Sequence, residues 1–166
     1  MAWAAFRRAR HVVLYAARAA EVDPGHLAVL IEGNGEQASY YPRVDGDDLV
    51  FHRARLHELV PGRFGIAEPT AEAPLLAHDV DDMIVIVPGV GFDRAGGRLG
   101  TGKGYYDRAL PAYTRATRIG ISLETCVVDR LPTDSWDVPM HVVATERDFL
   151  VVDPRVDAHP GDPPWT

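Results

Sequence analysis

The sequence has 166 residues, of which 46% are hydrophobic and 25% charged, and its formal net charge is −7. This length predicts one domain with an ordinary hydrophobic core, and the acidic balance argues against general nucleic-acid binding. The single cysteine, Cys126, excludes a disulfide within the chain and favours a reducing compartment, so a cytoplasmic location is expected. No apolar run approaches the ~20 residues that a membrane span needs, and no membrane contact is expected.

Short apolar runs predict strands along the chain, at residues 12–15, 39–42, 49–52, 83–87, 118–123 and 149–152. Asp23 followed by Pro24 is typical of a helix start, with the acid at the N-cap and the proline at the first helical position. This helix is expected to run through about Ile31 and to end at Gly33 and Gly35. A second helix is expected over residues 105–112, and the Asp-Gly pair at residues 45–46 predicts a hairpin turn.

The strongest strand, residues 83–87 (MIVIV), is apolar without alternation. Such a run indicates a strand buried on both faces, as in a parallel sheet. It is followed by a glycine-rich loop, a helix and another strand, which is the pattern of a βαβ unit. The sequence therefore predicts a single-domain, Rossmann-like three-layer α/β fold with a mostly parallel central sheet. The fold is expected to span residues 1–152, and a Pro/Gly/Asp-rich tail to span 153–166.

The glycine-rich segment at residues 87–108 is the most informative part of the chain. Glycines let the backbone approach a ligand closely, and the helix start that follows offers unpaired N–H groups. Arg98 and Lys103 add two cations, so the segment predicts a phosphate site. It is not an ordinary P-loop, because Gly104 stands where the Mg²⁺-binding hydroxyl should be, and its glycine spacing does not fit a dinucleotide fingerprint. Asp107 is the nearest candidate for a metal ligand.

The same residues carry a family resemblance. Residues 88–93 (PGVGFD) followed by 98–107 (RLGTGKGYYD) resemble the signature of 5-formyltetrahydrofolate cyclo-ligases, also called methenyltetrahydrofolate synthetases. Further matching pieces occur in the family's order: Tyr15 with 21–23 (EVD), 41–43 (YPR), 64–69 (FGIAEP), 131–132 (LP), 136–140 (WDVPM) and 144–146 (ATE). The resemblance runs from about Phe6 to Leu150.

The resemblance implies a ligase that converts 5-formyltetrahydrofolate, with ATP as co-substrate and Mg²⁺, to 5,10-methenyltetrahydrofolate, ADP and phosphate. It implies that Arg98 and Lys103 neutralise the triphosphate during the reaction. The backbone of Gly100, Thr101, Gly102, Lys103 and Gly104 would surround phosphate, Glu21 and Tyr105 would contact the folate, and Asp107 and Asp137 would hold Mg²⁺. The only partner expected is the folate, and a monomer or weak homodimer is expected.

The family's basic helix for ATP lies upstream of the part that matches Phe6, so the sequence is expected to lack it. The alternative is therefore a folate- or nucleotide-binding relative without turnover, and a weaker third reading is a sugar-phosphate or coenzyme A-type ligand. Trp136 replaces a common histidine of the family. Tyr105 and Tyr106 point to different sides of a helix, so one is expected in the core and one in the site. Cys126 has no obvious base beside it, which favours a buried thiol over a nucleophile.

Overall fold

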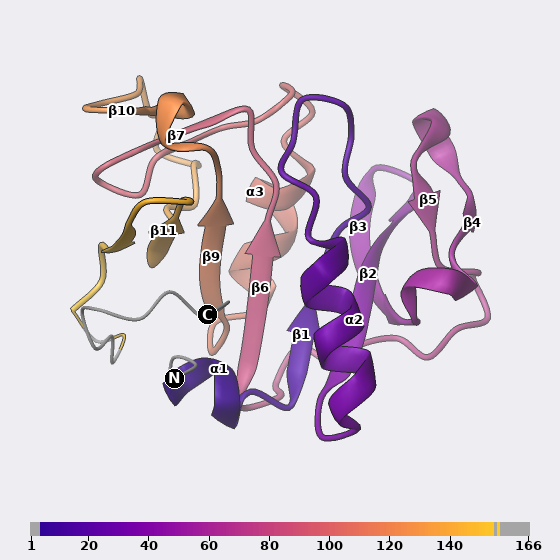
Figure 1. Ribbon diagram of the computed structural model, residues 1–166. Helices are drawn as coiled ribbons and strands as arrows, with labels where there is room; N and C mark the ends of the chain where they lie inside the picture. Colours follow the sequence, from indigo (N-terminus) through magenta and orange to yellow (C-terminus); the bar gives the residue numbers. More distant parts are fainter. Residues whose placement is uncertain (1–3, 155, 157–166) are drawn as a thin grey trace.

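A computed structural model describes residues 4–154 and 156, and its centre is a seven-stranded sheet with the order β12-β11-β9-β6-β1-β2-β3 (Figure 1). The strands are β1 (His11–Val13), β2 (Ala38–Asp45), β3 (Asp48–Arg53), β6 (Met83–Val87), β9 (Thr117–Ile121), β11 (Val142–Ala144) and β12 (Phe149–Val151). The five inner strands are parallel to one another, and β3 and β12 pair antiparallel at the two edges. The predicted mostly parallel sheet is confirmed.

Helices cover both faces of this sheet. The helices are α1 (Ala4–Arg8), α2 (Gly25–Asn34) and α3 (Tyr105–Ala109), with 3-10 turns η1 (Leu56–Glu58), η2 (Arg63–Gly65), η3 (Leu110–Ala112) and η4 (Glu124–Cys126). In Figure 1, α2 lies in front of the sheet and α3 behind it, which gives the three predicted layers. None of the described helices is long and apolar enough to cross a membrane.

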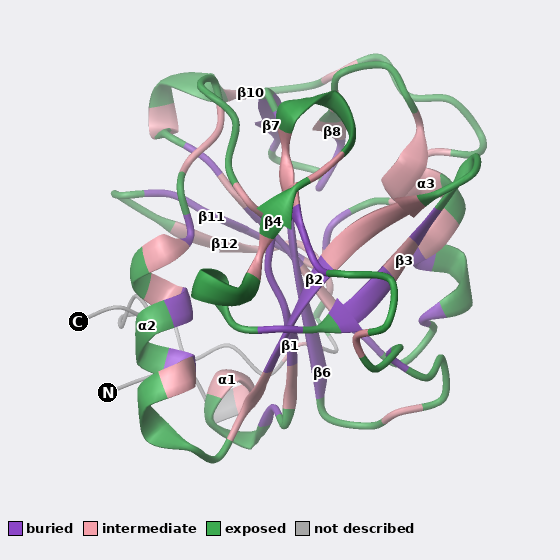
Figure 2. Ribbon diagram, turned by 90° about the vertical axis from the view of Figure 1, so that its right-hand side faces the viewer, coloured by how far each residue is buried: buried purple, intermediate pink, exposed green. Residues whose placement is uncertain are grey.

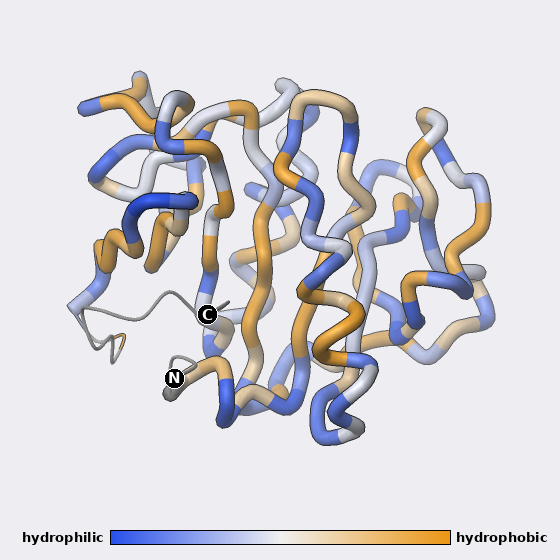
Figure 3. Tube along the Cα trace, viewed as in Figure 1, coloured by the Kyte–Doolittle hydropathy of each residue, from blue (hydrophilic) through white to orange (hydrophobic). Residues whose placement is uncertain are grey.

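The core divides into two clusters, one on each face of the sheet. Ile84 and Ile86 of β6 join the cluster that includes Ala28 and Ile31 of α2, whereas Val85 of β6 joins the cluster on the other face. All five residues of β6 are buried (Figure 2), and the strand is apolar along its whole length (Figure 3). Burial of each such side chain stabilises the fold by roughly 1.5–3 kcal/mol. Because both faces of β6 are covered, every position of this strand favours an apolar residue, and the apolar run therefore has the same bounds as the strand.

The strand order reverses between β1 and β6. From β1 the chain passes through α2 to β2 on one side, whereas β6, β9 and β11 succeed one another on the other side. The loop after β1 (residues 14–24) and the glycine-rich loop after β6 therefore leave neighbouring strands at the same edge, the upper edge in Figure 1. Open α/β sheets bind ligands outside the carboxyl ends of their strands, at this kind of reversal.

Two small sheets lie beyond the central one and were not predicted. β4 (Val60–Pro61) pairs with β5 (Ala67–Glu68), and β7 (Gly91–Asp93) pairs with β8 (Arg98–Leu99) and β10 (Val127–Val128). These strands have two or three residues each, too few to show a period in the sequence. β11 was missed for the same reason.

The predicted helix boundaries need correction. α2 continues to Asn34, three residues beyond the prediction, so Gly33 lies inside the helix; it ends at Gly35, whose φ is 70°. Pro24 occupies the N-cap, and Asp23 instead accepts a hydrogen bond from the N–H of Gly25 at 2.9 Å. The second helix begins at Tyr105 as predicted but tightens into η3 at Leu110. Most of the predicted tail, residues 155 and 157–166, lies outside the described residues.

Candidate active site

The glycine-rich segment has two halves with different roles. In the first half, β7 and β8 form a hairpin in which the N–H of Asp93 donates to the carbonyl of Gly97 at 2.9 Å. Gly96 has a φ of 84°, and a Cβ there would lie 2.5 Å from the carbonyl oxygen of Met140. A Cβ on Gly89 would lie 2.6 Å from the Phe92 ring. These glycines are therefore required for packing inside the protein.

The second half, residues 100–104, has an open backbone. Residues 101–103 are exposed and Gly100 is half-buried; Gly102 and Gly104 have φ values of 80° and 64°, and a Cβ on Gly102 would meet nothing within 4 Å. Within the described part of the chain, none of the N–H groups of residues 100–104 donates a hydrogen bond. Unpaired N–H groups in a turn of this kind form a concave site for anions. α3 has only five residues, so the loop backbone, more than the predicted helix dipole, makes the site electropositive.

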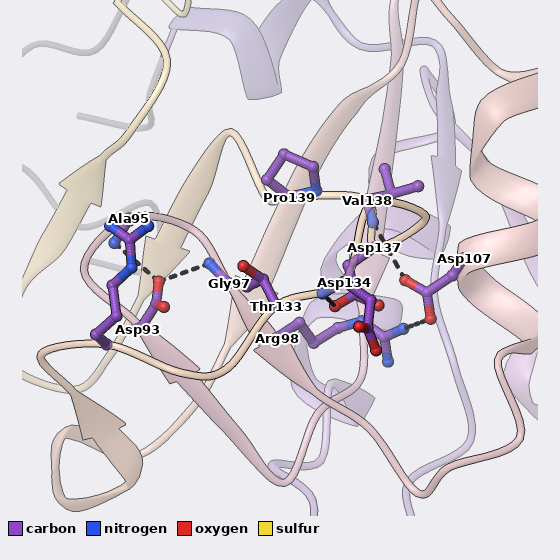
Figure 4. Close-up of a pocket in the computed structure, with 11 residues that line it drawn as sticks. Asp93, Ala95, Gly97, Arg98, Asp107, Thr133, Asp134, Asp137, Val138 and Pro139 are labelled. Carbon is purple, nitrogen blue, oxygen red and sulfur yellow. Dashed lines mark hydrogen bonds and ion pairs between the residues drawn. The ribbon is translucent and has the colours of Figure 1, made fainter.

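A cleft of about 210 Å³ brings together Arg98, Asp107 and Asp137 (Figure 4). Its lining residues are Asp93, Ala95, Gly97, Arg98, Asp107, Arg130, Thr133, Asp134, Asp137, Val138 and Pro139. One carboxylate oxygen of Asp107 accepts from Arg98 at 2.6 Å, and the other accepts from the N–H of Val138 at 3.3 Å. Asp137 accepts from the N–H of Asp134 at 2.7 Å. The two predicted metal ligands thus share one cleft.

Arg98 is held by the protein itself. Its side chain is 8% exposed and pairs with Asp107, and its guanidinium lies 5.7 Å from the centre of the Tyr106 ring. Its Nε is buried without a hydrogen-bond partner among the described residues. Arg98 is thus a fixed cation whose charge the Asp107 carboxylate already compensates; its role toward phosphate stays a prediction.

Lys103 does not line this cleft and instead lies beside an aromatic ring. Its Nζ lies 5.5 Å from the centre of the Phe64 ring, and the guanidinium of Arg63 lies 5.5 Å from the same ring. Phe64 is 53% exposed and has a φ of 61°, and an exposed aromatic ring held in a left-handed conformation is uncommon. The structure therefore places the Lys103 ammonium, which makes no ion pair with any other described residue, beside an aromatic surface. Phe64 belongs to the family pattern, but the sequence alone assigned it no role.

Glu21 lies in the loop between β1 and α2. Burial raises the pKa of Tyr15, and the Glu21 carboxylate raises it further. Burial also raises the pKa of Tyr106, while Arg98 lowers it and Glu21 raises it. The Glu21 carboxylate is thus within electrostatic reach of both phenols, at the reversal between β1 and β6. The Tyr106 hydroxyl is buried, and Tyr105 and Tyr106 are both half-buried against the same core cluster, so the division into one core and one site tyrosine stays a prediction.

The cleft fits a metal only in part. Among the described residues, no group of three or more His, Cys, Asp or Glu side chains is arranged to hold a metal ion. Asp107 and Asp137 supply two carboxylates, which suits Mg²⁺, because this ion is commonly held by one or two carboxylates together with substrate phosphates and water.

Comparison with known proteins identifies the relationship. The sequence model of the 5-formyltetrahydrofolate cyclo-ligase family matches residues 1–146. The chain belongs to this family.

Individual relatives agree with the family assignment. A 5-formyltetrahydrofolate cyclo-ligase of Escherichia coli is 37% identical over 111 residues, which cover 63% of this chain and 59% of that protein. One from Mycolicibacterium smegmatis is 34% identical over 107 residues, covering 63% and 55%. The solved structure of Aquifex aeolicus 5,10-methenyltetrahydrofolate synthetase superposes with a TM-score of 0.72 at 33% identity, over 95% of this chain and 77% of that one. The chain therefore spans little more than half the length of these curated cyclo-ligases.

The match to the cyclo-ligase family model includes every predicted site residue, from Glu21 to Asp137. It also includes three residues of this edge that were not predicted, Phe64, Asp93 and Arg130. Arg130 lines the cleft and has no ion pair among the described residues, but a single arginine in a loop carries no signal in a sequence. Cys126 is exposed, so the prediction of a buried thiol is wrong. It lies in η4, a surface turn before β10.

Proposed function

We propose that this chain is a 5-formyltetrahydrofolate cyclo-ligase that forms 5,10-methenyltetrahydrofolate, ADP and phosphate from 5-formyltetrahydrofolate and ATP. The observation that carries this proposal is the edge between β1 and β6. There the loop after β1 and the glycine-rich loop leave neighbouring strands, Glu21 and Arg98 both act on the Tyr106 phenol, and Asp107 and Asp137 line one cleft. The single cysteine supports a cytoplasmic location, and we propose a monomer or weak homodimer.

The reaction has two chemical steps. The formyl oxygen attacks the γ-phosphorus of ATP, and the bond to ADP breaks. N10 of the folate then attacks the activated formyl carbon, and the carbon–oxygen bond breaks with release of phosphate. Such chemistry needs positioning and charge stabilisation more than it needs a covalent protein intermediate.

Different residues would supply the positioning and the charge stabilisation. The N–H groups of residues 100–104 would bind phosphate oxygens, and Lys103 would stabilise charge that develops on the transferred group. Glu21 and the half-buried Tyr105 would contact the folate. Arg98 acts through Asp107, whose carboxylate it holds by the 2.6 Å ion pair.

Magnesium would be held by Asp107 and Asp137. Bound there, it would neutralise phosphate oxygens and align the triphosphate. The hydrogen bonds from Arg98 and Val138 to Asp107, and from Asp134 to Asp137, fix the two carboxylates before the ion arrives. Fixed ligands of this kind cost less reorganisation on binding.

The proposal is tested by mixing the protein with 5-formyltetrahydrofolate, ATP and Mg²⁺ and following methenyltetrahydrofolate by its near-ultraviolet absorbance. We expect product that requires ATP and appears in step with one equivalent of phosphate. Absence of product, with ATP or folate still bound in calorimetry, would leave a binding protein without turnover and sink the proposal.

Glu21→Gln tests the folate contact. The substituted side chain keeps an oxygen for the N–H of Arg18, which Glu21 accepts at 2.9 Å, but loses the charge. A charge-assisted hydrogen bond contributes about 1.5–3 kcal/mol, so we expect folate to bind about 10- to 100-fold more weakly, with ATP affinity unchanged. The measurement is calorimetric titration with each ligand. Glu36→Gln, an exposed acid after α2, is the control, and an equal effect in both variants would remove Glu21 from the site.

A further inference from the structure

Asp93 joins two loops that both reach the cleft. It is the last residue of β7 and is 1% exposed. Its Oδ1 accepts from the N–H groups of Ala95 at 2.9 Å and Gly97 at 2.6 Å. Its Oδ2 accepts from the N–H of Leu131 at 2.8 Å, across 38 positions of sequence. Figure 4 shows the Asp93 carboxylate beside Ala95 and Gly97, at one end of the cleft.

The two loops carry the residues assigned to the metal. Gly97 leads directly into Arg98, which pairs with Asp107. The segment that begins at Leu131 contains Asp134 and Asp137, which are hydrogen-bonded to each other. At its end, the N–H of Val138 donates a hydrogen bond to Asp107. The Asp93 carboxylate therefore fixes the start of one segment relative to the other, and the Asp107 carboxylate fixes their far ends.

The surroundings of Asp93 are built for a charged carboxylate. Three N–H groups compensate a charge that is otherwise buried, and hydrogen bonds to a charged acceptor are roughly twice as strong as neutral ones. A Cβ on Gly97 would lie 2.6 Å from Asp93 Oδ2, so this glycine is needed for the carboxylate to reach Leu131. An aspartate that only stabilises its own turn would accept these hydrogen bonds through one oxygen, here Oδ1. The bond from Leu131 is the contact that a turn does not explain.

We propose that Asp93 is a positioning residue for the metal and phosphate site: it does not touch the substrate, and its Oδ2 holds residues 131–138 so that Asp137 faces Asp107. This inference rests on the proposed function, because it concerns the site assigned to Mg²⁺ and ATP.

Asp93→Asn separates the hydrogen bonds accepted by Oδ1 from the one accepted by Oδ2. The amide oxygen keeps the bonds from Ala95 and Gly97, while the NH₂ group faces the N–H of Leu131, so two donors meet. We expect the Mg²⁺ concentration for half-maximal turnover to rise at least tenfold, with the KM for folate unchanged. The Leu131 amide should exchange with solvent faster, whereas the Ala95 and Gly97 amides should stay protected.

Asp129→Asn is the matched control, since this neighbour of Leu131 has a fully exposed side chain and should leave all these values unchanged. Unchanged Mg²⁺ dependence in Asp93→Asn, despite faster exchange at Leu131, would overturn the inference. Equal weakening of folate and metal binding would also overturn it, because it would show general loss of structure.

Binding of Mn²⁺ together with ADP, measured by calorimetry, gives a readout that does not need turnover. An inactive wild-type protein would contradict the proposed function alone. A tenfold weaker Mn²⁺ affinity of Asp93→Asn relative to Asp129→Asn would then still support the positioning role, and equal affinities would contradict it.

Discussion

Asp107→Asn is expected to lower turnover at least 100-fold and to destabilise the fold by about 3–5 kcal/mol. The stability loss follows because Arg98, whose side chain is 8% exposed, would keep its charge and lose its partner at 2.6 Å, and an uncompensated buried charge costs about this much. The activity loss follows because the substitution removes one of the two carboxylates assigned to Mg²⁺. Urea unfolding gives the first quantity and product formation gives the second.

The exposed pair of Arg115 and Asp81 provides the control. Its side chains are 59% and 75% exposed, so Asp81→Asn should change stability by less than about 1 kcal/mol. A double variant, Arg98→Met with Asp107→Leu, separates the two effects: it should recover most of the stability, since a buried pair can be replaced by apolar groups, but not the activity. An Asp107→Asn protein as stable as Asp81→Asn would show that Arg98 does not depend on this carboxylate.

Gly96→Ala is expected to destabilise the protein by about 2–5 kcal/mol. Its φ of 84° is unfavourable for alanine, and the new Cβ would lie 2.5 Å from the carbonyl oxygen of Met140. The backbone strain costs about 1–2 kcal/mol and overpacking typically adds about 1–3 kcal/mol. The midpoint of urea unfolding measures the loss. Because Met140 follows Pro139 of the cleft, the remaining folded protein should also bind Mg²⁺ more weakly.

Gly46→Ala is the matched substitution in an open turn. Gly46 has a φ of 60°, but a Cβ at this position would meet nothing within 4 Å, so only the backbone strain of about 1–2 kcal/mol applies. Equal losses for the two variants would contradict the close contact between Gly96 and Met140.

The sequence predicted six of the seven strands of the central sheet and part of the site. β6 was predicted with its observed bounds, because five successive buried residues leave a run without alternation. Asp107 and Asp137 were both assigned to a metal from the family pattern, and both line one cleft. Their role as metal ligands stays a prediction, as do the roles of Glu21 and Tyr105.

The remaining features depend on contacts that sequence does not display. Arg98 was predicted as a cation of the phosphate site, but the ion pair that compensates its charge with Asp107 was not predicted. The partners of Asp93 are backbone N–H groups, one of them 38 positions away, and backbone donors leave no trace in residue identity. Phe64 meets Lys103 only because η2 and the glycine-rich loop approach each other in space.

The most direct test of the account compares Lys103→Ala with Arg115→Ala in the methenyltetrahydrofolate assay. Lys103 is an exposed cation at the proposed phosphate loop, whereas Arg115 is an exposed cation just before β9, paired with Asp81 at the opposite edge of the sheet. The account predicts ATP-dependent product from the wild type and from Arg115→Ala, and a rate at least about 100-fold lower from Lys103→Ala. Equal rates in the two variants, or product that forms without ATP, would contradict it.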